Sequence, residues 1–375
     1  MPKTRCVMIG GFLGAGKTSA MLLLAADLVR RGLRAGLITN DQSAGLVDTA
    51  RVRAAGFPVR EVTGGCFCCK FNSLVDAAKA LADQSAPDVL IAEPVGSCTD
   101  ILATVGYPLR HLHGERMEIS PLSVVVDPIR LERVLGLRSG AHFSEKVLYV
   151  YRKQLEEAEI IVINKIDLLD GGGRTGLRRA AQAEFPRATI FEVSCVTEEG
   201  LTEWFDALLA NRLGQRPAIE VDYDTYAQGE ALLGWLNATA LVTAETPFDG
   251  NAFLIALART LREKLRASQV ELAHLKMTLA PDEGPDLCAV GLTGTGNEPQ
   301  TTHSLKGPLS SGELTINLRA EADPEQLERL VKAAAGAVAP QTVVVNNMSA
   351  FRPGRPEPTH RMAQAADGQS RGIGP

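Results

Sequence analysis

The chain has 375 residues, of which 45% are hydrophobic and 22% are charged, and its mean hydropathy is +0.01. This composition excludes a mainly disordered chain, a collagen-like fibre and a disulfide-stapled miniprotein, and the length predicts about two domains at roughly 150 residues each. The 39 basic and 44 acidic side chains leave a net charge of −5, which gives no global electrostatic reason to bind nucleic acid or an anionic membrane.

The sequence also gives no sign of a membrane span. The apolar residues at 21–29 are interrupted by Asp27 and followed by two arginines, so they fall short of the roughly 18 residues that a span needs. The first residues lack the apolar stretch and cleavage site of a secretory signal. Seven cysteines, an odd number, indicate thiols in a reducing compartment more than a disulfide framework. We therefore expect a cytoplasmic protein with no membrane and no nucleic-acid partner.

The first half of the chain alternates short β-rich runs with amphipathic helical stretches, which is the pattern of βαβ units around a parallel sheet. Several runs, such as residues 160–163, are continuously apolar, as buried parallel strands are. The glycines at 171–173 predict a flexible connection. We predict strands over 5–9, 35–39, 58–62, 88–92, 122–126, 160–163 and 189–193, and helices over 19–31, 72–84, 143–157 and 201–212.

The pattern changes near residues 215–224. The remainder predicts a helix over 251–268, strands over 270–279, 287–293 and 313–320, a helix over 324–338 and a strand over 342–346. Consecutive strands between two helices predict a smaller α+β domain with an antiparallel sheet. From residue 352 onward the chain is rich in Pro, Gly and polar residues, which is typical of a disordered tail. We therefore expect domains over 1–213 and 214–348 and a disordered tail over 349–375.

Residues 11–18 read GFLGAGKT and satisfy the phosphate-loop pattern G-x-x-x-x-G-K-[ST] between a predicted strand and a predicted helix. The glycines let backbone N–H groups surround phosphates, and the start of the helix adds positive potential. Lys17 would neutralise charge on the β- and γ-phosphates, and the Thr18 hydroxyl would complete a magnesium shell. A glycine-rich turn with an accidental lysine is the alternative, but the strand and helix context favours a P-loop NTPase domain. We expect nucleotide contacts from Gly11, Gly14, Ala15, Gly16, Lys17 and Thr18.

The tetrapeptide NKID at 164–167 directly follows the predicted strand at 160–163. Its pattern, Asn-Lys-x-Asp, is the guanine reader of P-loop GTPases. Asp167 would accept hydrogen bonds from the guanine N1–H and 2-amino group, whereas adenine would leave this carboxylate unpaired. Ser194 stands where many GTPases carry a base-contacting Ser-Ala. GTP is therefore the favoured nucleotide, with base contacts from Asn164, Lys165, Asp167 and Ser194.

Glu93 follows the predicted strand at 88–92 and opens the sequence EPVG. An acidic residue after an apolar strand is where a P-loop protein places its magnesium-orienting carboxylate, and Gly96 could approach the γ-phosphate. A plain strand exit is the alternative for Glu93 taken alone. Asp41 ends the second predicted strand at the same edge, where it would help to hold magnesium or position the attacking water. We expect Lys17, Asp41 and Glu93 to be catalytic, and Thr18 and Glu93 to bind magnesium.

Residues 64–69 read GGCFCC. Thiolates from Cys66, Cys68 and Cys69 can supply three soft ligands to zinc, cobalt or another late transition metal, leaving a fourth position for water, an exogenous group or a partner residue. Such incomplete coordination suits a site that passes its metal on. Packing or redox chemistry is the alternative, but neither explains three thiols so close behind a turn-like Gly-Gly.

Other candidate ligands are weaker. His111 and His113 could supply a fourth ligand, but histidines in a loop with Gly and Arg are more often solvated. For Cys98, close after Glu93, and for His274 we expect ordinary core or surface positions.

The four motifs GGFLGAGKT, GGCFCC, EPVG and NKID, in this order, resemble the CobW-type metallochaperone GTPases, relatives of the HypB and UreG nickel-insertion proteins and of the MeaB-type cobalamin-enzyme chaperones. The resemblance covers residues 3–213. It implies a P-loop fold, slow GTP hydrolysis, and coupling of the nucleotide state to delivery of zinc or cobalt. The implied partner is a client metalloprotein or cofactor-dependent enzyme, and a homodimer is left open.

The chain departs from this family in three respects. CobW-type proteins usually carry Asn-Glu-Phe-Gly after the second strand, whereas residues 40–43 read NDQS. A histidine-rich metal-holding segment is absent, because the six histidines are scattered. The C-terminal domain shows no familiar CobW-type motif, which leaves the client open.

Two rival functions remain. The first is a GTP-dependent scaffold or reactivation chaperone for a cofactor-dependent enzyme, with structural or redox-sensing cysteines. The second is an ATP-dependent small-molecule kinase, against which the NKID motif argues. The metallochaperone hypothesis places the thiols at 66–69 near the switch loops, because they lie between the second strand and Glu93. There, γ-phosphate contacts could order or release them.

Overall fold

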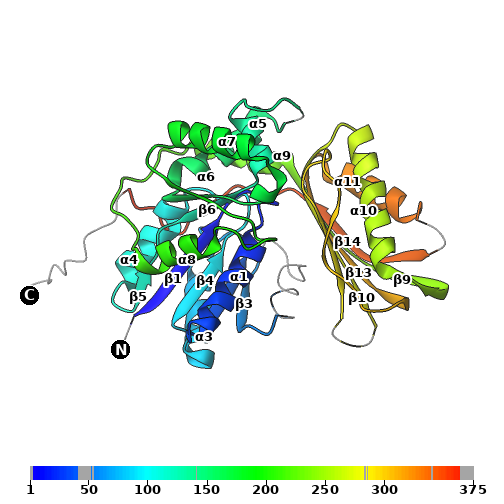
Figure 1. Ribbon diagram of the computed structural model, residues 1–375, viewed down its shortest axis with the longest axis horizontal. Helices are drawn as coiled ribbons and strands as arrows, with labels where there is room; N and C mark the ends of the chain where they lie inside the picture. Colours follow the sequence, from blue (N-terminus) through cyan, green and yellow to red (C-terminus); the bar gives the residue numbers. More distant parts are fainter. Residues whose placement is uncertain are drawn as a thin grey trace, which may run out of the picture.

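The computed structural model describes residues 3–40, 52, 55–140, 142–282, 284, 286–338 and 341–363. Figure 1 shows two domains, one built on a parallel sheet between helices and the other on an antiparallel sheet with helices on one face. This is the α/β plus smaller α+β architecture expected from the sequence. Among the described residues, no helix combines the length and apolar character needed to cross a membrane.

The first sheet is parallel and has the strand order β3-β2-β4-β1-β6-β7-β8, with β5 paired to β1. Because β1 lies between β4 and β6, the loops that follow these three strands meet at one edge of the sheet. Ligands of open α/β sheets bind at such an edge. The strands are β1 Thr4–Gly10, β2 Ala35–Asn40, β3 Val59–Val62, β4 Val89–Glu93, β5 Met117–Ile119, β6 Ser123–Val126, β7 Ile160–Ile163 and β8 Thr189–Glu192.

Helices cover both faces of this sheet. Side chains alternate along a strand, so Val7 and Ile9 of β1 pack toward α1 (Lys17–Arg30) and α8 (Leu201–Ala210), while Met8 packs into the core on the opposite face. The remaining elements of this domain are α3 Phe71–Ser85, the π-helical segment η1 Leu102–Gly106, α4 Tyr107–His113, α5 Pro128–Val134, α6 Glu145–Glu157, the 3₁₀ turn η2 Ile166–Leu168, α7 Gly171–Glu184 and α9 Tyr223–Leu232.

The glycines at 171–173 do not form the flexible connection that we expected. They are the first turn of α7, where the Asp170 carboxylate caps the helix by accepting a 2.7 Å hydrogen bond from the Gly173 N–H. An aspartate cap satisfies a backbone donor that the helix itself leaves unpaired, which offsets the low helix propensity of glycine.

The second sheet is antiparallel and has the order β12-β11-β10-β13-β9-β14. Two amphipathic helices, α10 (Gly250–Ala267) and α11 (Pro324–Ala335), pack their apolar sides on one face of it. The strand β9 was missed by sequence reasoning because its Gly, Asn and Ala residues have low β-propensity. The strands are β9 Leu233–Phe248, β10 Glu271–Pro281, β11 Cys288–Leu292, β12 Gln300–His303, β13 Leu309–Glu321 and β14 Thr342–Phe351.

Two expected domain limits change. Residues 214–232 include α9, which packs against α6 so closely that a Cβ on Gly229 would lie 2.3 Å from the Lys146 carbonyl oxygen. These residues therefore belong with the first domain, and we place the start of the second at Leu233.

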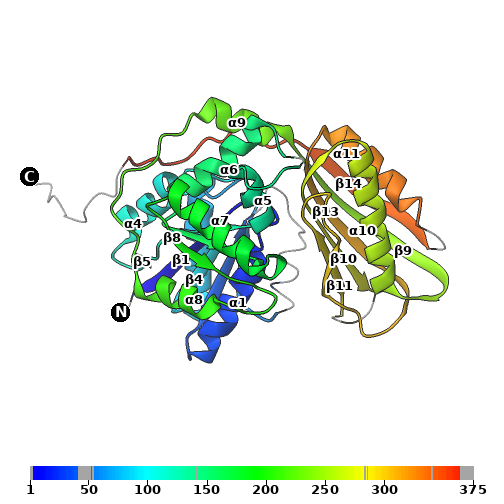
Figure 2. The same cartoon turned by 45° about the horizontal axis from the view of Figure 1, so that its top comes forward.

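The expected disordered tail over 349–375 is also wrong as far as residue 363. Residues 349–351 belong to β14, and residues 352–363 run back along the first domain (Figure 2). Backbone hydrogen bonds hold this return segment, from Thr359 N–H to Cys68 O at 2.8 Å and from Met362 N–H to Ala103 O at 2.9 Å. Its composition resembles that of a disordered chain, but these partners satisfy its backbone. Residues 364–375 lie outside the described part of the chain.

A buried carboxyl group connects α6 to the segment after β4. Glu157 accepts hydrogen bonds from the Leu102 N–H at 3.0 Å and from the Thr99 hydroxyl at 3.4 Å. Burial raises the pKa of Glu157 to about 8. The group is therefore mostly protonated at neutral pH.

We expect Glu157→Gln to change the pH dependence of stability. The unfolded-state pKa of a glutamate is about 4.3, so folding raises the pKa of Glu157. The bound proton therefore stabilises the folded protein fully below the unfolded-state pKa. This stabilisation is lost as the pH rises through about 8. Glutamine has no proton to lose. The melting temperature of the variant minus that of the wild type should therefore increase between about pH 5 and about pH 9. The exposed neighbour Glu156→Gln is the control, and a constant difference for Glu157→Gln would contradict the assignment.

Candidate functional site

The phosphate loop is shaped by glycines that no other residue could replace. Gly11 has φ +128°, and a Cβ there would lie 2.1 Å from the Val125 carbonyl oxygen on the neighbouring strand β6. Gly16 has φ +101°, and a Cβ there would lie 2.3 Å from the Asn164 side-chain nitrogen. The loop therefore packs directly between β1 and β6, with its N–H groups at the start of α1. This is the arrangement that binds phosphate in P-loop proteins.

Lys17 and Thr18 begin α1 and are buried beside Glu93 at the end of β4. The Lys17 ammonium lies 3.9 Å from a Glu93 carboxylate oxygen and donates a 3.3 Å hydrogen bond to the Phe12 carbonyl. The Thr18 hydroxyl donates to Glu93 at 3.1 Å. The structure thus brings together three of the residues predicted for phosphate and magnesium chemistry. Asp41, the fourth, lies outside the described residues.

The NKID segment lies against the phosphate loop. The Asn164 amide donates to the Ala15 carbonyl at 2.9 Å and accepts from the Cys195 N–H at 3.0 Å. The Lys165 ammonium donates to the Gly14 carbonyl at 2.9 Å. These contacts fix the end of β7 to the loop after β1.

Asp167 and Ser194 are adjacent at the outer end of this segment. The buried Ser194 hydroxyl donates to the exposed Asp167 carboxylate at 2.5 Å and accepts from the N–H groups of Val196 and Thr197. The serine therefore orients the carboxylate that sequence reasoning assigned to the base.

Two side chains at the start of α5, which contact the NKID segment and the phosphate loop, were not predicted. The buried Asp127 caps this helix and pairs with the Lys165 ammonium at 2.8 Å. Burial raises the pKa of Asp127, but the positive charges of Lys165 and Arg130 outweigh it and hold the pKa below its ordinary value. The signal was present, because Asp127 follows an apolar strand just as Glu93 does.

Arg130 joins the phosphate loop to the second domain. Its buried guanidinium donates to the Leu13 carbonyl at 2.6 Å and to the Ala273 carbonyl of β10 at 3.0 Å. It also lies over the rings of Phe12 and Phe143, 5.1 and 5.2 Å from their centroids. An isolated arginine in a sequence carries no signal for such a role.

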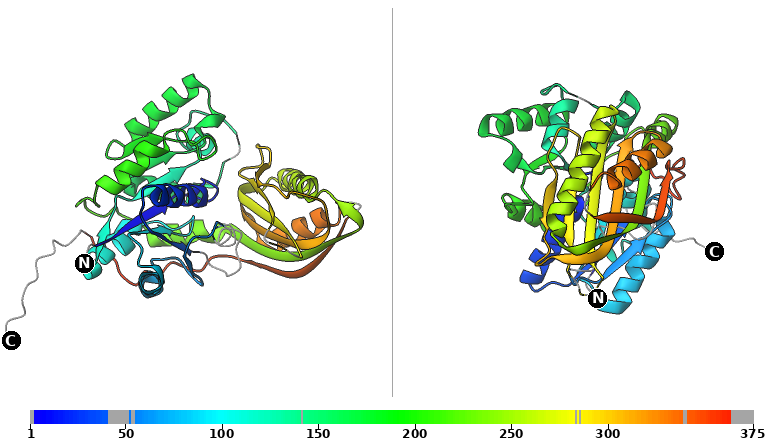
Figure 3. Two further views of the ribbon diagram at one scale, coloured as in Figure 1. Left: turned by 60° about the horizontal axis from the view of Figure 1, so that its bottom comes forward. Right: turned by 90° about the vertical axis from the view of Figure 1, so that its right-hand side faces the viewer.

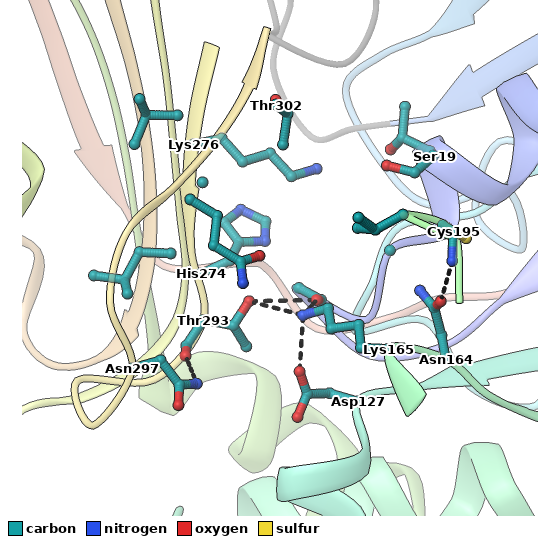
Figure 4. Close-up of a pocket in the computed structure, with 18 of the residues that line it drawn as sticks. Ser19, Asp127, Asn164, Lys165, Cys195, His274, Lys276, Thr293, Asn297 and Thr302 are labelled. Carbon is teal, nitrogen blue, oxygen red and sulfur yellow. Dashed lines mark hydrogen bonds and ion pairs between the residues drawn. The ribbon is translucent and has the colours of Figure 1, made fainter. Parts of the chain in front are cut away.

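A cavity of about 390 Å³ opens between the phosphate loop, the NKID segment and the inner face of the second sheet. Figure 4 shows Lys165, Asn164 and Ser19 of the first domain across this cavity from His274, Lys276 and Thr302 of the second. The Thr293 hydroxyl closes one end, 3.3 Å from the Gly14 carbonyl oxygen. His274, for which we expected a core or surface position, is buried in β10, and it also lines this cavity.

The predicted thiol cluster is assembled. The Sγ atom of Cys66 lies 2.8 Å from that of Cys68 and 3.2 Å from that of Cys69, and the last two are 3.8 Å apart. Cys98, for which we expected an ordinary position, places its Sγ atom 3.8 Å from that of Cys68. Four thiolates around a tetrahedral metal ion at about 2.3 Å have sulfur separations of about 3.8 Å. The sulfur atoms of Cys66, Cys68 and Cys69 therefore fit a soft metal ion with small adjustments. Cys98 lies beside Cys68 but outside the group whose ligand atoms are all within 4.8 Å of one another.

One thiol of the cluster ionises first. Side-chain hydrogen bonds with Cys68, Cys69 and Cys98 hold the pKa of Cys66 well below its ordinary value, whereas those with Cys66, Cys69 and Cys98 raise the pKa of Cys68. The predicted alternatives stay apart: His111 is exposed and His113 half-buried, and neither belongs to the metal-ligand group formed by the described cysteines.

The return segment 352–363 lies over this cluster, as the left view of Figure 3 helps to follow. The Glu357 N–H donates to the Cys69 sulfur at 3.2 Å, and the Thr359 hydroxyl donates to the Cys69 carbonyl at 3.2 Å. Arg361 anchors the segment through a 2.7 Å ion pair with the buried Asp100. N–H donors to sulfur stabilise thiolates, and they are common around metal-bound cysteines.

Comparisons with known proteins agree with this site. The family model "CobW/HypB/UreG, nucleotide-binding domain" matches residues 5–192. The chain is 27% identical over 240 residues to the zinc chaperone CobW of a Sinorhizobium species and 30% identical over 179 residues to the zinc chaperone YeiR of Escherichia coli K12. These matches cover 56% and 47% of this chain, and they span only 66% and 51% of the length of the two relatives.

Among solved structures, the chain is similar to HypB from Helicobacter pylori in complex with nickel. The TM-score is 0.41 at 20% identity, over 56% of this chain and 86% of the other.

We expect Asn164→Ala to destabilise the protein even without nucleotide. The variant leaves the Ala15 carbonyl and the Cys195 N–H without their side-chain partner, which costs about 1–3 kcal/mol when such groups are buried. Urea unfolding of the nucleotide-free protein measures this loss. Asn211→Ala removes a hydrogen bond of an exposed asparagine to Ala207 and should cost less than about 0.5 kcal/mol. Equal stabilities of the two variants would contradict the structural role of Asn164.

Proposed function

Because this chain belongs to the CobW/HypB/UreG family, we propose that it is a GTP-hydrolysing metallochaperone that couples its nucleotide state to the binding and transfer of zinc or cobalt. The observation that carries the proposal is a short connection between two sites. Glu93, beside the phosphate loop, and Cys98, beside the thiol cluster, are separated by four residues. A backbone movement at Glu93 can therefore be transmitted to Cys98 through a short segment.

In this proposal Lys17 contacts the β- and γ-phosphates from its buried position at the start of α1. The Thr18 hydroxyl and the Glu93 carboxylate, 3.1 Å apart, offer the hard oxygen ligands that magnesium prefers. Magnesium, when bound, would neutralise charge on the β- and γ-phosphate oxygens. Asp41 remains our candidate for positioning the attacking water.

The guanine base would occupy the outer end of the site. Asp167 is exposed and oriented by Ser194, so its carboxylate can accept from the base, while the stem of Lys165 lies along the loop at Gly14. A carboxylate placed to accept two hydrogen bonds discriminates strongly against a base without those donors, because the carboxylate is then left unpaired.

We expect GTP, but not ATP, to displace bound GDP, and Asp167→Ala to abolish this preference. Losing both hydrogen bonds should weaken GTP binding by about tenfold or more. Competition with a fluorescent GDP analogue measures both effects, and Asp83→Ala on the exposed side of α3 is the control. Equal displacement by ATP in the wild-type protein would contradict the guanine assignment and favour the kinase alternative.

The metal half of the proposal rests on the thiol cluster. Cys98 would be the ligand through which the nucleotide acts, because Gln154 of α6 donates hydrogen bonds to the carbonyls of both Gly96 and Cys98, at 3.0 and 2.8 Å. The backbone of Gly96 is expected to approach the γ-phosphate. Movement of Gly96 on hydrolysis would thus be transmitted to Cys98 and would change the coordination of the cargo.

We expect zinc affinity to differ between the GTPγS-bound and GDP-bound protein. Replacing Cys66, Cys68 and Cys69 together with serine should abolish tight zinc binding while GTP binding is retained. Cys98→Ser should lower zinc affinity by about tenfold or more and reduce the difference between nucleotides. Competition with a chromogenic zinc chelator measures these affinities.

Cys288→Ser, in the second domain, is the control for loss of a buried thiol. Equal zinc affinities with both nucleotides would contradict coupled transfer. Zinc binding by the triple serine variant would favour the scaffold alternative, in which the cysteines do not transfer metal.

We further propose that the partner is a client metalloprotein or cofactor-dependent enzyme, in line with the zinc-chaperone names of the two curated relatives. A cytoplasmic location would suit the chain, because all its cysteines are free thiols and would stay reduced there.

A further inference from the structure

The inner face of the second sheet forms one wall of the nucleotide cavity. The cavity is lined on one side by Lys17, Thr18 and Lys165 and on the other by residues of β10, β11 and β12 and of the loop between β11 and β12. Alternation along β10 turns His274 and Lys276 toward the cavity, while Leu275 and Met277 pack into the core beneath α10 and α11. A wall that only closed the cavity could be apolar, yet this one presents His274 and Lys276 from β10 and further polar side chains from residues 293–302.

His274 has the features of a ligand-binding side chain. It is 8% exposed, and its Nδ1 atom has no hydrogen-bond partner among the described residues. Figure 4 shows the ring directed into the cavity, above Thr293 and opposite Lys165. Buried polar atoms are almost always satisfied, so an unsatisfied ring nitrogen that faces a cavity indicates a missing ligand.

The charges around His274 define the kind of ligand. Burial holds the pKa of His274 well below its ordinary value, and the cations Lys276, Arg319, Lys17 and Arg130 lower it further. A neutral imidazole can still donate from one nitrogen. Four carboxylates line the cavity. Glu93 is paired with Lys17 and Asp127 with Lys165. Glu298 is paired with Arg262, and the exposed Asp167 accepts from Ser194. On the side of the second domain, β10 adds the Lys276 ammonium to the lysines of the first domain, and a lysine ammonium is a common phosphate-binding group.

The position of β10 indicates which part of the nucleotide it would contact. Arg130 binds the Leu13 and Ala273 carbonyls together, and a Cβ on Gly14 would lie 3.0 Å from the Ala273 carbonyl oxygen. The strand thus touches the phosphate loop at the residue before His274. Since Lys17 acts on His274 and is the lysine that reaches the β- and γ-phosphates of a nucleotide, the ring lies at the phosphate end of the cavity.

We propose that Lys276 and His274 of β10 bind the terminal phosphate of GTP, so that the second domain reads the nucleotide state by direct contact. The inference rests on the proposed function, because it requires that GTP occupy the cavity. It adds a phosphate contact from outside the nucleotide-binding domain. Loss of the γ-phosphate on hydrolysis would remove this contact and loosen β10 from the phosphate loop.

The test compares GTPγS with GDP by isothermal titration of the full chain. Lys276→Met should weaken GTPγS binding by about tenfold, the effect of one charge-assisted hydrogen bond, and should change GDP binding by less than about threefold. Lys276→Arg should restore most of the affinity for GTPγS. Lys306→Met, which removes an exposed lysine of the same domain outside the cavity, should leave both affinities unchanged.

A second measurement does not depend on affinity. In protein labelled with ¹⁵N-histidine, the imidazole resonances of His274, assigned with His274→Gln, should move when GTPγS binds and return toward the free position with GDP. Identical imidazole shifts with the two nucleotides would overturn the phosphate contact.

The outcomes separate the two proposals. A wild-type protein that binds no GTPγS overturns the proposed function and this inference with it. A wild-type protein that binds GTPγS, with a Lys276→Met variant that matches Lys306→Met or loses GTPγS and GDP binding equally, overturns only the inference.

Discussion

The arrangement of both domains depends on one buried charge. The Arg130 side chain is buried, with 8% of its surface exposed, so most of its positive charge must be compensated inside the protein. Carbonyl oxygens from Leu13 and Ala273, the rings of Phe12 and Phe143 and the nearby Asp127 carboxylate together provide that compensation. These groups come from the phosphate loop, from the start of α5, from the segment before α6 and from the second domain. Separating the domains would leave the charge without the Ala273 carbonyl. The position of β10 is thus connected to the conformation of the phosphate loop.

The features that the sequence predicted well are those whose chemistry is local. The phosphate loop and the NKID segment have fixed spacings because one short backbone segment must meet one ligand. The continuously apolar β7 is apolar because both faces of a parallel sheet are covered. The three clustered cysteines are close in space because they are close in sequence. In all these cases the neighbours in the chain are also the neighbours in the fold.

The features that escaped prediction depend on contacts between distant residues. Cys98 looks like a small buried hydrophobe in the sequence, and only the adjacency of β2, β3 and β4 brings it to Cys68. In the sequence, His274 is one residue of an ordinary strand. Only the placement of the second sheet against the phosphate loop shows that His274 lines the cavity. Composition led to the wrong prediction of disorder at residues 352–363. The composition of a segment shows how little apolar surface the segment can bury by itself, but it does not show which hydrogen-bond partners a folded domain offers to the segment.

The path of the return segment has a consequence for biosynthesis. The second domain is inserted into the first, since the chain leaves it at residue 232 and rejoins it at residue 352. Chains emerge from the ribosome from the N-terminus onward, and domains tend to fold as they appear. The thiols can thus assemble more than two hundred residues before the segment that covers them has been made. Until the return segment has been translated, the cluster remains open to any metal ion in the surrounding solution.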